Sequence, residues 1–363
     1  MSTKPTVLWW GRFDPEYSRN RILRQLLTEL GWVIAEFHPY SSAMGDWEAK
    51  FRRVQRPDLV WVPCFRQRDL AAASRWALSV GVPVLFDPLI SAYDKQVFER
   101  VKYASGSRHA QRLHTWEQGL FKCADAILAD TQPHADYFAH EFGVYPQRLH
   151  VVYVGAEESL FCPAPMPDHA DGSPVEALFY GSFIGLQGPQ VIVEAARLCL
   201  GNGVRWTLLG SGPLLAECER LARGLHNLCF EEPVPYPHLP ERIHRADILL
   251  GVFGTGAKAG RVIPNKVFQA LACARPVVTQ RAGAYPREFD AAHPGVSWVG
   301  AGDPDALAKA VAELANKPDQ LVELGQNARA GYEVWFGRDR VREMLGRALQ
   351  GLRLGTFMIR VPD

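Results

Sequence analysis

The sequence of 363 residues lacks the features of secreted, disulfide-stabilised or membrane-spanning proteins. Its seven cysteines are scattered and form no C-x-x-C pair, which favours reduced, mostly buried thiols over a disulfide framework or a zinc site. No apolar run approaches the roughly 20 residues that a membrane-spanning helix needs. Residues 1–10 lead directly into a predicted strand, so we expect no signal peptide. These absences indicate a cytoplasmic protein.

Net charge is also nearly absent, at +1, and by itself predicts nothing about partners. We expect no nucleic-acid partner. The charge is nevertheless unevenly spread along the chain. Residues 50–112 contain twelve Lys or Arg against five Asp or Glu, a net +7, and residues 113–168 contain two against eight, a net −6. The basic part could attract an anionic partner such as a phosphorylated lipid or an acidic glycan, although solvated helix faces explain the same counts.

Short apolar, β-branched runs alternate with segments of helical periodicity from end to end. The predicted strands cover residues 6–10, 33–37, 59–64, 83–86, 126–129, 151–154, 177–180, 206–209, 228–230, 248–253 and 277–280. The predicted helices cover residues 19–30, 71–79, 95–102, 110–123, 133–142, 189–199, 213–221, 240–246, 264–274 and 305–315, followed by a long polar stretch near 320–352. Such alternation predicts α/β domains with parallel, doubly wound sheets.

A proline-rich segment interrupts this alternation, with four prolines between Phe161 and Pro174. That composition is typical of a linker. The sequence therefore predicts two Rossmann-like lobes, with ligands bound in a cleft at the carboxyl ends of their strands. The predicted boundaries are an N-terminal domain over 1–165, a linker over 166–175, a C-terminal domain over 176–335 and a final helix over 336–363 that crosses back to the N-terminal domain.

The most informative segment is 254–280, in which a glycine-rich loop with Lys258 and Arg261 leads into a helix opened by Pro264. Proline is tolerated in the first turn of a helix, and the N–H groups that follow form a ready anion site. At about 100° per residue, Asn265, Lys266 and Gln269 share one face of this helix and Val267, Phe268, Ala270, Leu271 and Ala274 the other. The arrangement favours a phosphate-bearing ligand, although amphipathic helices of this kind also precede buried strands without any ligand.

Glycine-rich turns follow three strands of the second lobe, at 181–188, 210–212 and 254–260. None matches the dinucleotide fingerprint G-x-G-x-x-G with its acidic partner. Each turn alone is a weak signal. Parallel topology brings such turns to the same edge of a sheet, which strengthens the prediction of a ligand site there.

The order of these motifs resembles the nucleotide-sugar glycosyltransferases of the GT-B fold, most closely glycosyltransferase family 4. The resemblance rests on Tyr180-Gly-Ser-Phe with Gly188, Leu209-Gly-Ser-Gly-Pro213, Ile263-Pro-Asn-Lys-Val-Phe-Gln-Ala-Leu-Ala272 and Arg275-Pro-Val-Val-Thr279. In the first lobe, Gly11–Arg21, Asp87–Ser91 and Ala124–Thr131 also fit. The resemblance implies a donor site in the C-terminal domain and an acceptor site in the N-terminal domain, facing a central cleft.

Carried over by position, the resemblance places the donor diphosphate at the turn 181–188. We predict donor contacts at Gly181, Ser182, Phe183, Gly210, Gly212, Lys258, Asn265, Lys266 and Gln269. Family members usually carry an Arg and a Lys where this chain has Ser182 and Gln187, and two glutamates where it has Arg261 and Gln269. We interpret this as displaced positive charge, with Lys258, Arg261 and Lys266 neutralising the donor diphosphate. The alternative is a degenerate site without catalysis.

In the first lobe, Asp87 follows a strand where family members often place a histidine that faces the cleft. We predict catalytic roles for Asp87 and Arg261. Contacts to the acceptor or the cleft are predicted for Gly11, Asp14, Arg19, Ser91 and Tyr93. For Asp14 and Asp87, N-capping and the end of a strand are competing interpretations. His109, His114 and His134 are predicted to face solvent.

The resemblance implies transfer of a sugar from a nucleotide-diphosphate sugar to a glycan, lipid-linked or small-molecule acceptor, with retention of anomeric configuration and without metal or cofactor. A catalytically silent scaffold that binds a nucleotide sugar or a partner protein is the alternative, and a sugar-nucleotide epimerase is a third hypothesis. The basic, aromatic stretch 102–116 could rest on the anionic inner face of a membrane or could simply cover the sheet.

Overall fold

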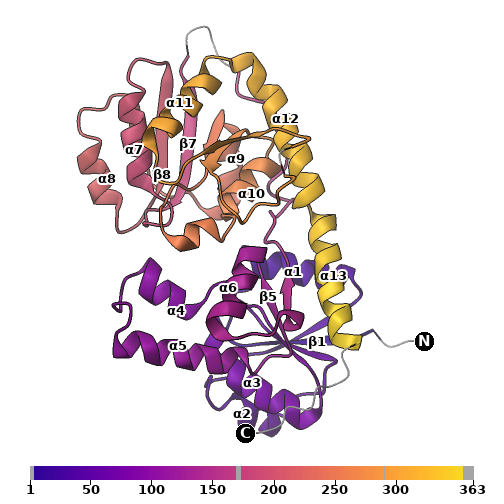
Figure 1. Ribbon diagram of the computed structural model, residues 1–363. Coiled ribbons are helices and arrows are strands. Elements are labelled where there is room, and N and C mark those ends of the chain that lie inside the picture. Colours follow the sequence, from indigo (N-terminus) through magenta and orange to yellow (C-terminus); the bar gives the residue numbers. More distant parts are fainter. Residues whose placement is uncertain (1–3, 169–172, 290, 355–363) are drawn as a thin grey trace. The chain divides into compact units, whose positions relative to one another are not determined.

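The computed structural model consists of two compact units, each an α/β layer structure built on one six-stranded parallel sheet (Figure 1). Unit 1 comprises residues 1–153 and 341–363, and unit 2 comprises residues 154–340. The fold class predicted from the sequence, two Rossmann-like doubly wound lobes, is confirmed. The residues that the structure describes are 4–168, 173–289 and 291–354.

In unit 1 the strands follow the order β2-β1-β3-β4-β5-β6. They are β1 (Thr6–Trp10), β2 (Val33–Phe37), β3 (Leu59–Val62), β4 (Val84–Phe86), β5 (Ala126–Ala129) and β6 (Leu149–Val151). The helices are α1 (Ser18–Glu29), α2 (Gly45–Phe51), α3 (Gln67–Val80), α4 (Ala92–Asp94), α5 (Arg108–Phe121), α6 (Gln132–Phe142) and α13 (Arg338–Leu354), with short turns η1 (Lys95–Glu99) and η2 (Pro146–Arg148).

Neighbouring tryptophans on β1 show how this sheet acquires two cores. Successive side chains of a strand point to opposite faces. Trp9 therefore stacks on Trp61 at 4.9 Å in the core beneath α1 and α13. Trp10 contacts Trp76 in the core beneath α2, α3, α5 and α6. Helices thus cover both faces of the sheet, and its strand ends remain available at the edge.

In unit 2 the strand order is β12-β11-β10-β7-β8-β9. The strands are β7 (Val175–Ser182), β8 (Val204–Ser211), β9 (Leu228–Glu231), β10 (Ile248–Leu250), β11 (Val277–Gln280) and β12 (Val296–Val299). The helices are α7 (Pro189–Leu198), α8 (Leu215–Leu221), α9 (Leu239–His244), α10 (Asn265–Ala272), α11 (Pro304–Ala315) and α12 (Pro318–Trp335), with single turns η3 (Tyr236–His238) and η4 (Ala257–Gly260). Apolar residues of β7, β8, α7 and α11 form the core of this unit.

Several predicted elements need correction. The polar stretch near 320–352 is two helices, α12 and α13, because the chain breaks at Phe336, which is buried against Phe268 and Phe289 at 5.1 and 4.9 Å. The helix expected over 95–102 is replaced by α4 and η1, since Val101 adopts a left-handed φ of 50°. The sequence pattern also missed α2 and β12, and it placed β6 too late in the chain.

Parts of two predicted segments lie outside the described residues. These are 169–172 of the predicted linker and 355–363 of the predicted final helix. Within the described part, α13 packs its apolar side chains on unit 1, where Val341, Leu345 and Ala348 join the core that also contains α1. The domain boundaries and the linker stay predictions.

Candidate functional site

The glycine turns of unit 2 meet at the carboxyl edge of its sheet. β7 and β8 pair in parallel to their last residues, so Gly181 lies opposite Gly210. A Cβ on Gly210 would come within 2.0 Å of the Gly181 carbonyl oxygen, and one on Gly212 within 2.6 Å of the Phe183 amide nitrogen. Only glycine fits at this distance, and both residues have a positive φ. The site therefore presents bare backbone.

The third turn contacts the first. The Phe253 amide donates to the Gln187 carbonyl oxygen at 3.1 Å. A Cβ on Gly254 would lie 2.3 Å from the Gly185 carbonyl oxygen. Loops that are far apart in the sequence thus share one edge of the sheet, as parallel topology predicts.

Replacement of Gly210 tests this close approach. We expect Gly210→Ala to lower the free energy of unfolding by about 2 kcal/mol, because it adds strain at a φ of 137° to the overlap with Gly181. Gly256→Ala is the matched control, since Gly256 lies in the same lobe with a negative φ and no heavy atom within 4 Å of its Cβ position. Urea unfolding of both variants measures the difference. Equal stabilities would show that the turns tolerate separation.

Lys266 is the most unusual charged residue of this edge. Its side chain is buried, with 5% of the residue exposed. The Nζ donates to Gln187 Oε1 at 3.0 Å and lies 3.6 Å from the centre of the Phe179 ring. Burial holds the pKa of Lys266 well below its usual range. No carboxylate is among these contacts, so an anion bound beside the amine would favour its charged form.

The helix that carries Lys266 differs in detail from the prediction. Pro264 is the N-cap of α10 and lies outside the helix, and no side chain caps the first turn. Ala274 lies beyond the helix with a left-handed φ of 55°. On the predicted polar face, Lys266 and Gln269 are both buried.

Gln269 accepts a hydrogen bond from the Tyr180 hydroxyl at 2.9 Å. Asn265 and Arg261 are half-buried, and Lys258 is buried. Together with Lys266, Arg261 and Lys258 place three basic side chains within nine residues of the chain. Ser182 is exposed at the end of β7. This composition suits a ligand that carries several negative charges.

The side chain of Phe183, a predicted donor contact, points into the core. It is fully buried and packs edge-on against Phe179 at 5.8 Å, and a donor contact at this residue stays a prediction. Its amide donates to the Ser211 carbonyl at 3.0 Å. Phe183 therefore holds the two turns together from within the core.

In unit 1, two predicted site residues bind each other. Arg19 Nε donates to both carboxylate oxygens of Asp87, at 2.8 and 3.0 Å, and both residues are completely buried. Arg19 Nη1 donates to the Val152 carbonyl oxygen at 3.1 Å. Burial raises the pKa of Asp87, which Arg19 opposes. The sequence predicted separate ligand contacts, whereas the structure joins these residues in a buried ion pair.

A second buried pair was missed. His134 Nδ1 lies 2.6 Å from Asp130 Oδ1, and both residues are buried, so the prediction that His134 faces solvent is wrong. Asp130 directly follows β5 as Asp87 follows β4, and these strands are neighbours. That repeated strand–aspartate pattern, with a histidine four residues later on a predicted helix, was the available signal. Within the described chain, His134 Nε2 and Arg19 Nη2 have no hydrogen-bond partner.

The remaining predicted residues of unit 1 shape loops. Gly11 has a φ of 131° and is buried against Asp69, and Asp14 accepts the Glu16 amide in a turn. Ser91 caps α4 and donates to Glu117. Glu117 also accepts the Tyr93 amide at 2.7 Å. The buried Glu117 therefore holds this loop in place by hydrogen bonds, and the sequence analysis did not identify it.

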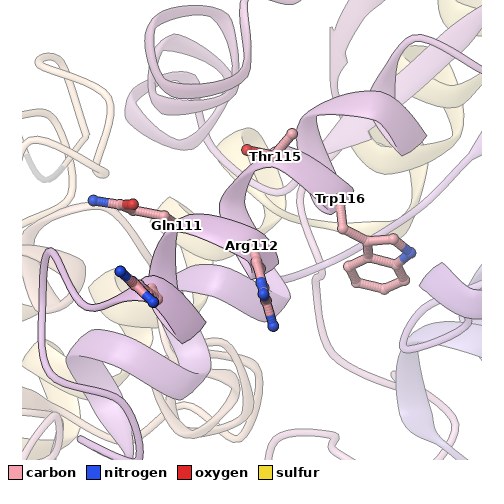
Figure 2. Close-up of a pocket in the computed structure, with 5 residues that line it drawn as sticks. Gln111, Arg112, Thr115 and Trp116 are labelled. Carbon is pink, nitrogen blue, oxygen red and sulfur yellow. The ribbon is translucent and has the colours of Figure 1, made fainter.

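Residues 108–116 of the basic stretch 102–116 lie in α5, and residues 102–107 precede this helix. A shallow hollow of about 520 Å³ on this helix is lined by Arg108, Gln111, Arg112, Thr115 and Trp116. Figure 2 labels four of these side chains, Gln111, Arg112, Thr115 and Trp116. All five side chains come from one helix, and Trp116 is only 39% exposed. The hollow involves none of the predicted donor or acceptor residues.

Among residues 4–168, 173–289 and 291–354, no group of three or more His, Cys, Asp or Glu side chains is placed to hold a metal ion. None of the helices described is long and apolar enough to cross a bilayer.

Two family models match most of the chain. The model described as "Glycosyl transferase 4-like domain" matches residues 11–155, in unit 1 and the first residues of unit 2. The model described as "Glycosyl transferases group 1" matches residues 174–317, in unit 2. The second match contains all three glycine turns and α10.

Curated relatives include a D-inositol 3-phosphate glycosyltransferase of Gordonia bronchialis, 27% identical over 315 residues, and D-inositol 3-phosphate glycosyltransferase 1 of Catenulispora acidiphila, 29% identical over 260 residues. The matches cover 80% and 65% of this chain. They span only 65% and 60% of the length of those relatives.

Solved structures share the fold. A sucrose-phosphate synthase of Thermosynechococcus elongatus has a TM-score of 0.72 at 17% identity, covering 98% of this chain and all of that chain. Anabaena HepE, crystallised in complex with UDP, has a TM-score of 0.69 at 13% identity, covering 95% of this chain and 99% of that chain.

Proposed function

Because this chain belongs to the GT-B glycosyltransferases of family 4, we propose that it transfers a sugar from a nucleotide-diphosphate sugar to a glycan, lipid-linked or small-molecule acceptor. The observation that carries the proposal is Lys266, a buried amine beside the edge where three glycine turns meet. Bare backbone at that edge admits a diphosphate, and the amine supplies the opposite charge. The proposal includes a role in glycan or glycoconjugate biosynthesis.

Transfer requires stabilisation of a diphosphate leaving group. In this proposal Lys258, Arg261 and Lys266 supply positive charge, and the uncapped first turn of α10 supplies N–H donors. A metal ion is then unnecessary, and we propose metal-independent, cofactor-free transfer with retention of configuration. The Tyr180 hydroxyl donates a hydrogen bond to Gln269 Oε1, and in this proposal the Gln269 amide also binds the ribose hydroxyls.

Uridine nucleotides are the first donors to test, since HepE was crystallised with UDP and with UDP-glucose. D-inositol 3-phosphate is the first acceptor to test, since it is named in the curated relatives. We place the acceptor in unit 1 and the donor in unit 2, in a cytoplasmic enzyme with a peripheral contact to an anionic membrane.

A thermal-shift series with UDP, GDP, dTDP and their sugars tests the donor site. A ligand at about 100 times its Kd stabilises the folded state by about 2.7 kcal/mol. For a unit of this size we expect the melting temperature of unit 2 to rise by roughly 5–10 °C with the correct nucleotide. If none of the nucleotides raises the melting temperature, the proposed donor site is wrong.

A catalytically silent scaffold is the second candidate. It is favoured by the absence of both family glutamates, since Arg261 and Gln269 occupy their positions. Release of nucleoside diphosphate from any nucleotide sugar, lost in Lys266→Ala, would exclude it. Binding without release, over a full panel of acceptors, would support it.

A further inference from the structure

Helix α2 presents an apolar surface to solvent. Tyr40, Met44, Trp47 and Phe51 are 82, 61, 72 and 90% exposed. We call these four residues the α2 apolar face. At about 100° per residue, the last three fall within about 60° of one another, opposite the buried Ala49. Monomeric soluble proteins rarely expose large apolar side chains in such a cluster.

The helix is held rigidly in this orientation. Arg75 donates to both carboxylate oxygens of Asp46, at 3.0 and 2.9 Å, and to the Ala43 carbonyl at 2.8 Å. A Cβ on Gly45 would lie 3.1 Å from Trp10, so α2 packs closely on the sheet. The outward direction of the apolar face is therefore set by contacts on its inner side.

Basic residues lie next to the apolar face in the sequence. Residues 40–56 contain Lys50, Arg52, Arg53 and Arg56 against two acids. Both acids are paired, Asp46 with Arg75 and Glu48 with Arg52 at 2.7 Å. The guanidinium of Arg52 also lies 4.7 Å from the centre of the Tyr40 ring. The exposed Lys50 and Arg53 thus add positive charge beside Phe51 and the end of α2.

We propose that the α2 apolar face, with Lys50 and Arg53 beside it, inserts into the headgroup region of an anionic membrane. Aromatic side chains with a cationic rim are typical of interfacial anchors. A symmetric contact with a second copy would bring the same basic side chains together, which disfavours a dimer. The α5 hollow offers one large apolar side chain, Trp116, and is the weaker candidate.

This inference makes specific the membrane contact included in the proposed function. It concerns only the binding of the protein to a membrane, which is measured without any enzyme assay. Failure of vesicle binding and failure of donor binding are therefore separate results.

The test is co-sedimentation of the full chain with vesicles of phosphatidylcholine alone and of equal parts phosphatidylcholine and phosphatidylglycerol. We expect binding to the anionic vesicles and at least a tenfold weaker partition for Trp47→Ser with Phe51→Ser. Lys50→Gln with Arg53→Asn should weaken it about 25-fold, at roughly fivefold for each cation near the surface. The matched control, Arg112→Gln with Trp116→Ser on α5, should bind like the wild type.

Other results would overturn the proposal. Equal partition to both kinds of vesicle, or none, would exclude an anionic bilayer as the occupant. Loss of binding in the α5 control alone would move the anchor to residues 102–116. A dimer in sedimentation equilibrium that Trp47→Ser with Phe51→Ser dissociates, without vesicle binding, would identify a second copy instead.

Discussion

Lys266→Met is expected to remove nucleotide-sugar binding while leaving the fold as stable as before or more stable. The amine is buried against Phe179 and Gln187, so an apolar side chain of similar length fits the same space at no cost of desolvation. Its ammonium form would be the deepest positive charge facing the diphosphate. We expect kcat/KM to fall by about 10² to 10³, in the range found when one preorganised group that stabilises developing charge is removed.

Proton uptake gives an independent measure of the same residue. Burial lowers the pKa of Lys266 in the free protein, whereas a bound diphosphate would favour the charged form. Donor binding should therefore consume a proton above the lowered pKa, and affinity should fall as the pH rises. Calorimetry in buffers of different ionisation enthalpy measures this uptake. It should vanish in Lys266→Met, and unchanged donor affinity in that variant would show that the diphosphate binds elsewhere.

Much of the fold was predictable because buried strands carry continuous apolar runs. The buried strands β1, β5 and β11 begin and end where the sequence pattern predicted, and so does the largely exposed edge strand β2. α2 was missed although Met44, Trp47 and Phe51 have helical spacing, because this helix is only 7 residues long. Helical periodicity is read over a window of roughly 11–18 residues, which α2 does not fill.

The parts of the candidate site that could be predicted are those that depend on residues close together in the sequence. Glycine turns after strands are local features, and parallel topology brings them together. The Arg19–Asp87 pair joins residues 68 positions apart, and Lys266 meets Gln187 across 79. No pattern in the sequence relates these positions. Burial of His134 likewise depends on packing between α6 and the strand end at Asp130.

Asp87→Ala is expected to be the most destabilising substitution in unit 1. It would leave Arg19 charged and completely buried without its carboxylate. Breaking a buried pair by removing one partner costs about 3–5 kcal/mol. At roughly 2–4 °C for each kcal/mol, the melting temperature of unit 1 should fall by roughly 10 °C. Calorimetric unfolding of the full chain measures the change.

The double variant Arg19→Met with Asp87→Leu is the matched control. It removes both charges together, and replacing a buried pair by apolar residues is often close to neutral. Most of the lost stability should therefore return, less the cost of the carbonyl of Val152 that Arg19 no longer satisfies. If the double variant is as unstable as Asp87→Ala, the two side chains are not energetically coupled.

Asp87→Asn then separates stability from catalysis. The amide keeps one acceptor oxygen for Arg19 Nε but carries no charge, so part of the pairing is lost and the packing is retained. If the role of Asp87 is purely structural, the turnover of each variant should be proportional to its folded fraction. Loss of turnover in Asp87→Asn, measured well below its melting temperature, would instead restore the catalytic role predicted from the sequence. That outcome would require the Arg19–Asp87 pair to open when the acceptor binds.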